Sequence, residues 1–296
     1  MISSLRRGST RFLAACLLLP AHAFAISLLW YSYAAPDSEY RTFYASLAKS
    51  QGWNITFFGP GSSMPDFGSY NALVIESGEA FRTNPPGGPY ATPDYSGILG
   101  DNSEIAAARG DRTFISGSDA DFHAVRGDSG YCTGPLVNGY HCGLFDGARG
   151  YLINAVDWAA SGSGLGVVSF FDGAFPGSFW WDNPNSFLRN DLYGYVANVY
   201  TNDALIQGAA AAYSLNQGLT STGLSNWNNS FHAMFSPTIP GYSPTVYSGT
   251  TPGYALSIAS DIQEPENVLL MMIGLAALFF VRRRHMNGKA RAASRS

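Results

Sequence analysis

Between residues 26 and 175, short apolar runs alternate with segments in which apolar residues recur at helical spacing. Five of these apolar runs are rich in β-branched and aromatic residues, which is typical of buried strands. They are ISLLWYSYA (26–34), WNITFFG (53–59), YNALVIES (70–77), RTFISG (112–117) and LGVVSFFDG (165–173). Strands that alternate with helices predict an α/β fold with a mainly parallel sheet covered on both faces.

Three segments between these strands carry helix signals. After Ser38, a typical N-cap residue, EYRTFYASLAKSQG spaces its apolar residues at helical intervals and ends on Gly52. Residues 103–109 and ARGYLINAVDWAAS (148–161) predict two further helices. Since crossovers between parallel strands are right-handed, a flavodoxin-like, doubly wound sheet is the expected fold class.

The pattern changes after residue 176, where Gly, Pro, Tyr and Thr become frequent and the periodicity weakens. The small residues at 204–213 predict a helix, and PTVYSGTTPGYALSIAS (244–260) predicts short strands joined by turns. No linker separates this region from the preceding one. We therefore expect one domain over residues 26–260, with additional C-terminal helices and short strands.

Residues 1–25 have the three parts of a secretory signal peptide. A basic start is followed by the apolar residues 12–19 and by the small residues Ala23 and Ala25. We expect cleavage after Ala25, because about eight apolar residues are too few to span a bilayer as an anchor. The chain is therefore predicted to be exported.

The C-terminal region contains VLLMMIGLAALFFV (268–281), an uncharged run that is followed directly by three arginines. A helix of this run is about 21 Å long, against a hydrocarbon core of about 30 Å. Snorkelling arginines and local thinning of the bilayer close part of this gap. The run predicts a single C-terminal transmembrane helix, with the arginines and the basic residues 286–296 in the cytoplasm and the acidic domain outside.

The tail over residues 261–285 resembles the PEP-CTERM sorting signal of Gram-negative bacteria. Besides the apolar run, the residues that carry the resemblance are Glu264, Pro265, Arg282, Arg283 and Arg284. Gln263 departs from the family, which usually has a proline at this place. The resemblance implies recognition by an exosortase-type membrane protease. It also implies export across the inner membrane, membrane anchorage, and then a place at the cell surface or outside the cell, in association with exopolysaccharide.

Charge is distributed very unevenly along the chain, although the formal net charge is only −4. Nine of the 17 basic residues lie in the two termini, so the stretch between them, residues 12–281, holds eight basic and all 21 acidic residues. Its formal charge of −13 would repel phosphate backbones, and the sequence contains no basic stripe. We therefore expect no nucleic-acid partner.

Two cysteines remain after removal of the signal peptide, Cys132 and Cys142 in YCTGPLVNGYHC. An even pair, close in sequence, in an exported chain favours a disulfide that closes this loop. Two reduced loop thiols are the alternative. A metal site needs more ligands than this loop offers, with His141 as its one obvious addition.

The order of predicted elements over residues 26–175 loosely resembles class I glutamine amidotransferase-like domains, including the ThuA-like group. This resemblance implies a candidate site in FISGSDADFH (114–123), where a central strand turns sharply into a helix. The family has a catalytic cysteine there, whereas this chain has Ser118 or Asp119. Glutaminase chemistry is therefore excluded, and a domain without catalytic function is the main expectation.

An extracytoplasmic hydrolase is the alternative, with Ser118 or Asp119 as the reacting group and His123 or His232 as its base. Spacing along the chain does not decide whether either histidine reaches these side chains. In the competing interpretation, the segment SGSD forms a turn and a helix cap and has no chemical role.

Two further sets of residues are candidate ligand sites. Asp119, Asp121 and Asp128 offer oxygen ligands for calcium, but their spacing lacks the glycine and the final glutamate of an EF-hand loop, so solvated carboxylates are the default. Four residues near the expected strand ends would form a crevice suited to a sugar, although core packing is the commoner role of such aromatic rings. They are Tyr31, Tyr33, Glu76 and Glu79. We expect neither a cofactor nor a bound metal ion.

The sequence thus predicts an exported, surface-destined protein with an amidotransferase-like α/β domain that has lost its nucleophile. Such a domain would serve as a binding or structural component of the envelope or of the exopolysaccharide matrix. The expected partners are the sorting protease, the membrane and a polysaccharide.

Overall fold

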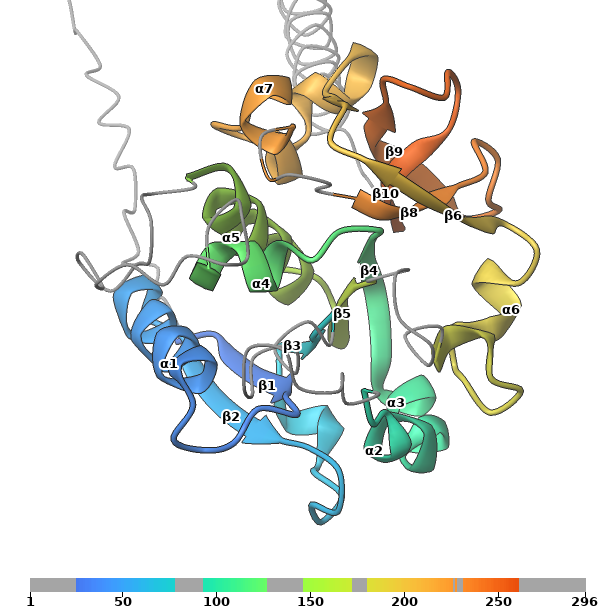
Figure 1. Cartoon of the computed structure of the whole chain (residues 1–296). Helices are drawn as coiled ribbons and strands as arrows, with labels where there is room; N and C mark the ends of the chain where they lie inside the picture. Colours follow the sequence, from blue (N-terminus) through green and yellow to red (C-terminus); the bar gives the residue numbers. More distant parts are fainter. Residues whose placement is uncertain are drawn as a thin grey trace, which may run out of the picture.

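A mixed α/β domain is built around one largely parallel central sheet (Figure 1). The computed structural model describes residues 25–77, 93–126, 146–171, 180–225, 227 and 231–260. The parallel strands are β1 (Ser27–Tyr31), β2 (Asn54–Phe58), β3 (Ala72–Ile75), β4 (Arg109–Ser116) and β5 (Leu165–Phe170). Their order in the sheet is β2-β1-β3-β5-β4, and each neighbouring pair is parallel.

Helices cover both faces of this sheet, because side chains along each strand alternate between two buried clusters. On β1, Leu28 and Trp30 belong to the first cluster, and Leu29 and Tyr31 to the second. The first cluster includes residues of α1 (Glu39–Gln51), α4 (Ala120–Arg126) and α5 (Asp146–Ala160). The second includes residues of α2 (Ser96–Gly100), α3 (Asn102–Ala108) and α6 (Arg189–Leu192).

Helix α1 shows how local sequence signals set the ends of an element. The Ser38 hydroxyl accepts a hydrogen bond from the Arg41 backbone N–H at 3.3 Å, as an N-cap residue does. Gly52 adopts a left-handed conformation with φ of 74° and closes the helix through its own N–H. Both predicted boundaries of this helix are confirmed.

The C-terminal region extends the sheet with antiparallel strands. They are β6 (Val196–Thr201), β7 (Ala204–Leu205), β8 (Phe231–Phe235), β9 (Tyr242–Ser248) and β10 (Ala255–Ser260). β10 lies beside β4, β8 and β9, so the end of the described chain is paired directly with the parallel part. A short helix, α7 (Ser221–Leu224), precedes β8. The C-terminal region and the parallel part thus share one sheet.

Two predictions about the fold need correction. The helix expected at 204–213 is wrong: β7 pairs with β9, and a 3-10 helix follows at Gly208–Ala212, because Gly208 has a φ of 59° that interrupts a regular helix. The flavodoxin-like order 2-1-3-4-5 is also not followed, since β5 lies between β3 and β4.

Several predicted features lie outside the described residues. They are the signal peptide up to residue 24, the loop with Cys132 and Cys142, Glu79, Asp128, the sorting motif, the membrane helix 268–281 and the basic end 286–296. Among the residues that are described, no helix is both long enough and apolar enough to span a bilayer.

Candidate functional site

The turn between β4 and α4 has the strand–turn–helix form expected from the sequence. Gly117 in this turn lies against β8, where its carbonyl oxygen accepts hydrogen bonds from the backbone N–H groups of His232 (2.6 Å) and Ala233 (3.1 Å). A Cβ atom on Gly117 would lie 2.0 Å from the carbonyl oxygen of Ala233. Glycine is therefore required for an approach that places His232 beside the turn.

Asp119 and the two candidate histidines come together next to this turn. The Asp119 side chain is 2% exposed, and its Oδ1 lies 3.4 Å from Nε2 of His123, one helical turn along α4. Burial alone would raise the pKa of Asp119, but attraction to protonated His123 and His232 outweighs burial and holds this pKa below its usual value. Three of the four predicted residues thus form one buried group.

Ser118 does not join this group. Its side chain is fully buried, and its Oγ lies 2.9 Å from Oγ of Ser116, which in turn lies 3.0 Å from the Tyr151 hydroxyl. None of the described histidines forms a hydrogen bond with the Ser118 hydroxyl. The structure therefore places the Ser118 hydroxyl in a chain of three hydroxyl groups.

Two buried carboxyl groups lie beside the turn, and the sequence did not predict that they belong together. Glu76 follows β3, and its Oε1 accepts a hydrogen bond from Nε1 of Trp30 at 2.9 Å. Asp121 on α4 accepts hydrogen bonds from the backbone N–H (2.9 Å) and the hydroxyl (3.1 Å) of Ser77. Because β5 separates β3 from β4, no spacing in the sequence marks these groups as neighbours.

The electrostatics of this pair differ from those of Asp119. Burial, reinforced by repulsion from Asp121, raises the pKa of Glu76 to about 8. Burial also raises the pKa of Asp121 to about 7, against the hydrogen bonds from Ser77 and with added repulsion from Asp119. At neutral pH this pair retains protons that exposed carboxyl groups would have released.

The predicted sugar crevice is not assembled within the described part of the chain. Tyr31 donates its hydroxyl hydrogen to the carbonyl oxygen of Asp94 at 2.7 Å, and Tyr33 packs edge-on against Tyr31 at a centroid distance of 5.2 Å. Both tyrosines lie in the second buried cluster. The Glu76 carboxyl contacts Trp30 of the first cluster, so it faces the other side of the sheet.

The three candidate calcium ligands are Asp119, Asp121 and Asp128. Asp119 lies against His123, Asp121 accepts hydrogen bonds from Ser77, and Asp128 is outside the described residues. Within the described ranges, no group of three or more His, Cys, Asp or Glu side chains could hold a metal ion.

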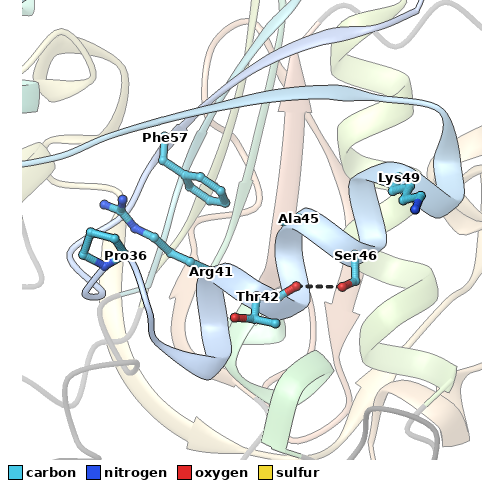
Figure 2. A pocket seen from close by; sticks show the side chains of 7 residues that line it. All are labelled: Pro36, Arg41, Thr42, Ala45, Ser46, Lys49 and Phe57. Atoms are coloured by element: carbon cyan, nitrogen blue, oxygen red, sulfur yellow. Dashed lines mark hydrogen bonds between the residues drawn. The ribbon is translucent and has the colours of Figure 1, made fainter.

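A surface groove of about 530 Å³ lies between α1 and the edge strand β2 (Figure 2). Arg41 and Lys49 stand at its two ends, and the hydroxyl groups of Thr42 and Ser46 lie between them. The sequence did not single out these residues, because they come from an ordinary amphipathic helix. The signal that could have found them is that Lys49 is the only lysine of the acidic domain.

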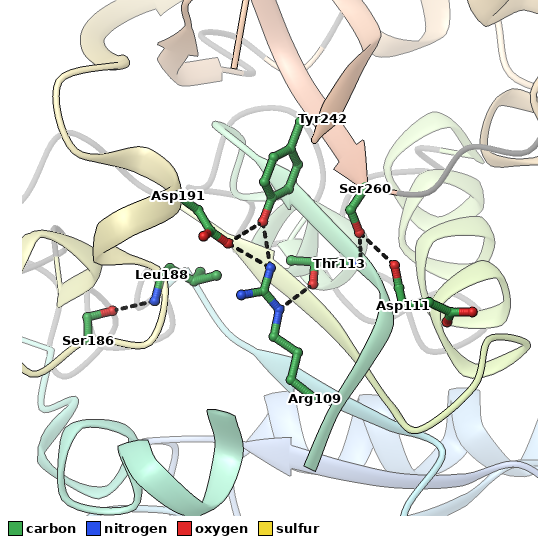
Figure 3. A network of polar contacts seen from close by, with 8 residues as sticks. All are labelled: Arg109, Asp111, Thr113, Ser186, Leu188, Asp191, Tyr242 and Ser260. Carbon is green, nitrogen blue, oxygen red and sulfur yellow. Dashed lines mark hydrogen bonds and ion pairs between the residues drawn. The ribbon is translucent and has the colours of Figure 1, made fainter. Parts of the chain in front are cut away.

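A second polar network lies at the opposite end of β4 (Figure 3). Arg109 donates hydrogen bonds from Nη2 to the Asp191 carboxylate and to the Tyr242 hydroxyl, both at 2.7 Å, and from Nε to Thr113 at 2.9 Å. Tyr242 also donates to Asp191 at 2.7 Å. This network joins β4 to α6 and β9, so it ties the parallel part of the sheet to the C-terminal region.

The chain matches no protein-family model, no curated protein and no solved structure. Its resemblances to sorting-signal proteins and to amidotransferase-like domains therefore rest on the residues and the order of elements that carry them. Of these two, only the order of elements concerns residues that the structure describes.

Proposed function

We propose that this chain is an exported, surface-destined protein whose doubly wound, amidotransferase-like domain is not catalytic. The domain acts as a binding or structural component of the envelope or of the exopolysaccharide matrix. Support comes from the signal-like residues 1–25, the acidic stretch between the two basic termini, with a formal charge of −13, and the sorting-type tail.

The observation that carries the proposal is the burial of Ser118 and the hydrogen bond between its hydroxyl and that of Ser116. A serine nucleophile needs a base within about 3.2 Å of its hydroxyl and access to its substrate. Here the hydroxyl is fully buried and bonded to Ser116, while His123 lies against Asp119. Amidotransferase-like domains have their nucleophile at this turn. In this chain the side chains of Ser116, Ser118 and Tyr151 form a buried hydrogen-bonded network there.

In the proposed route to the surface, an exosortase-type protease recognises the tail. Glu264 and Pro265 would mark the cut, the helix 268–281 would hold the chain in the membrane, and the arginines 282–284 would fix its orientation. The intact mass of the protein from cells would report both terminal cuts and the state of Cys132 and Cys142.

Absence of turnover is the first prediction. The purified full-length protein is tested on a panel of ester, amide and glycoside substrates. Its hydrolysis rates are expected to be no higher than those of buffer, and Ser118→Ala is expected to leave these rates unchanged. Hydrolysis that Ser118→Ala abolishes, in a variant with an unchanged melting temperature, would contradict the proposal.

A hydrolase centred on Asp119 is the second candidate, because the structure brings this carboxylate to His123 and His232. In such an enzyme the ionised carboxylate would act as nucleophile or base. Activity that Asp119→Asn removes and Ser118→Ala leaves intact would favour this candidate over both the serine hydrolase and the binding protein.

A further inference from the structure

The groove between α1 and β2 is shaped to receive an extended ligand. Arg41 and Lys49 are eight residues apart on one helix, which separates them by about 12 Å along its axis. Figure 2 shows them at opposite ends of an open groove, with the Phe57 ring beside Arg41. The residues that line it are Pro36, Arg41, Thr42, Ala45, Ser46, Lys49 and Phe57.

Both cations line the groove, and the charge of Arg41 also attracts the buried carboxyl of Glu76. Among the described residues, no carboxylate forms an ion pair with Arg41 or Lys49, whereas Arg109 and Arg189 each lie 2.7 Å from an aspartate. Arg41 is also held in place, because its guanidinium lies 5.0 Å from the centre of the Phe57 ring and donates to the Ser32 carbonyl oxygen at 3.2 Å. A positioned cation needs less ordering when a ligand binds.

The hydroxyl groups between the cations act as acceptors. Thr42 donates its hydroxyl hydrogen to the Ser38 carbonyl oxygen at 2.9 Å, and Ser46 donates its hydrogen to the Thr42 carbonyl oxygen at 2.8 Å. Each hydroxyl has a single hydrogen, so only oxygen lone pairs remain for a ligand. A matching ligand therefore combines negative charges at its ends with hydrogen-bond donors between them.

We propose that this groove binds an acidic polysaccharide, with sugar carboxylates at Arg41 and Lys49 and sugar hydroxyls donating to Thr42 and Ser46, so that two local cations hold the ligand against the negative net charge around them. A sugar acid carries both kinds of group on each unit. Polyphosphate carries the charge but has no chain of donors, and a neutral glycan has the donors without the charge. The inference rests on the proposed binding role and names its ligand class.

Titration calorimetry measures binding of the full-length protein to an oligogalacturonate of about six units. This ligand is long enough to cover the distance of about 12 Å between the two cations. Lys49→Gln is expected to weaken binding about threefold to fivefold, as for the loss of one exposed ion pair, and added salt is expected to weaken it further. Ser46→Ala, which favours the helix, is expected to weaken binding about twofold to fivefold. Arg189→Gln, an equal change of charge on α6, is the matched control and should have no effect.

Three probes of equivalent length complete the experiment: a neutral malto-oligosaccharide, polyglutamate and polyphosphate. Weak or no binding of all three supports the proposal. Binding of polyglutamate or polyphosphate as tight as that of the oligogalacturonate and insensitive to Ser46→Ala would overturn it in favour of a general anion site. Absence of oligogalacturonate binding, or binding that Lys49→Gln and Arg41→Gln leave unchanged, would also overturn it. These outcomes leave the lack of catalysis untouched, whereas hydrolysis of the oligogalacturonate would overturn the proposed function instead.

Discussion

The two ends of strand β4 carry polar networks of opposite character, one partly exposed and one buried. At its start, the charge of Arg109 is matched by Asp191, and Tyr242 and Thr113 complete the hydrogen bonds. At its end, Glu76, Asp119 and Asp121 gather three carboxyl groups, and only Asp119 lies against histidine. In the Arg109 network, a permanent cation balances the Asp191 carboxylate. In the carboxyl-rich network, bound protons reduce the negative charge of Glu76 and Asp121.

The difference shows what each network can do for the fold. The Arg109 guanidinium keeps its charge over the whole physiological pH range, so it is a permanent tie between β4, α6 and β9. The Glu76–Asp121 pair is favoured while protons are retained, because two buried negative charges repel each other in a low dielectric, and the attraction of Glu76 to Arg41 is too weak to offset its burial. The carboxyl end of the sheet is therefore the pH-sensitive end.

The largest effect is expected from added volume at the carboxyl end. Gly117→Ala would place a methyl group 2.0 Å from the Ala233 carbonyl oxygen and push β4 away from β8. We expect a loss of about 3 kcal/mol or more, which corresponds to a fall in melting temperature of about 6–12 °C. Gly100→Ala is the control, because nothing lies within 4 Å of its Cβ position. Equal melting temperatures for the two variants would show that the close contact at Gly117 does not hold this junction.

A smaller and pH-dependent effect is expected at Glu76. Its pKa is raised from 4.5 to about 8 on folding, so the folded state holds a proton that the unfolded chain releases above pH 4.5. Stability is therefore highest below pH 4.5 with respect to this group, falls as the pH rises towards 8, and stays low above it. Glu76→Gln should remove this loss and raise stability at pH 9 by about 2 kcal/mol, with little change at pH 4.

Melting curves at both pH values measure this difference. Glu104→Gln is the matched control, since it makes the same chemical change on an exposed residue of α3. A stabilisation of equal size at pH 4 and pH 9 would mean that the effect of Glu76→Gln is one of packing and not of proton binding.

The smallest effect is expected at the start of β4. Arg109→Gln removes a cation whose pair with Asp191 is partly exposed, with side chains 20% and 27% accessible. We expect a cost of about 1–2 kcal/mol, between the values for surface and buried ion pairs, seen as a lower urea midpoint at unchanged slope. Arg189→Gln, whose ion-pair partner Asp182 is 47% exposed, should cost less than about 0.5 kcal/mol. If Arg109→Gln lowers the free energy of unfolding no more than Arg189→Gln does, the Arg109 network does not tie β4 to α6 and β9.

Much of the parallel half was predictable from sequence because its signals are local. The run SLLWY is apolar on both faces, and Ser38 and Gly52 cap α1 through contacts with residues at most four positions away. The helix expected at 204–213 does not form, although alanine is a strong helix former, because β7 pairs with β9 and Gly208, with a φ of 59°, interrupts a regular helix.

The candidate site was predictable only in part. The strand–turn–helix around Gly117 was predicted from the sequence. The contact of Asp119 with His123 was left open, because spacing along the chain did not decide whether this histidine reaches the carboxylate. The position of His232 beside Asp119 could not be predicted, because it depends on the contact of β8 with the turn. The hydroxyl network that contains Ser118 could not be predicted either, because it includes Tyr151, which lies far away in the sequence.

By itself, the sequence determined the alternation of strands and helices, the capped first helix, the acidic character of the domain and the lack of a catalytic cysteine. The tertiary structure alone decided that β5 lies between β3 and β4, that Glu76 and Asp121 share one buried environment, and that Arg41 and Lys49 border a groove. Periodicity and capping are properties of neighbouring residues, whereas strand order and the solvation of a side chain depend on packing between segments far apart in the chain.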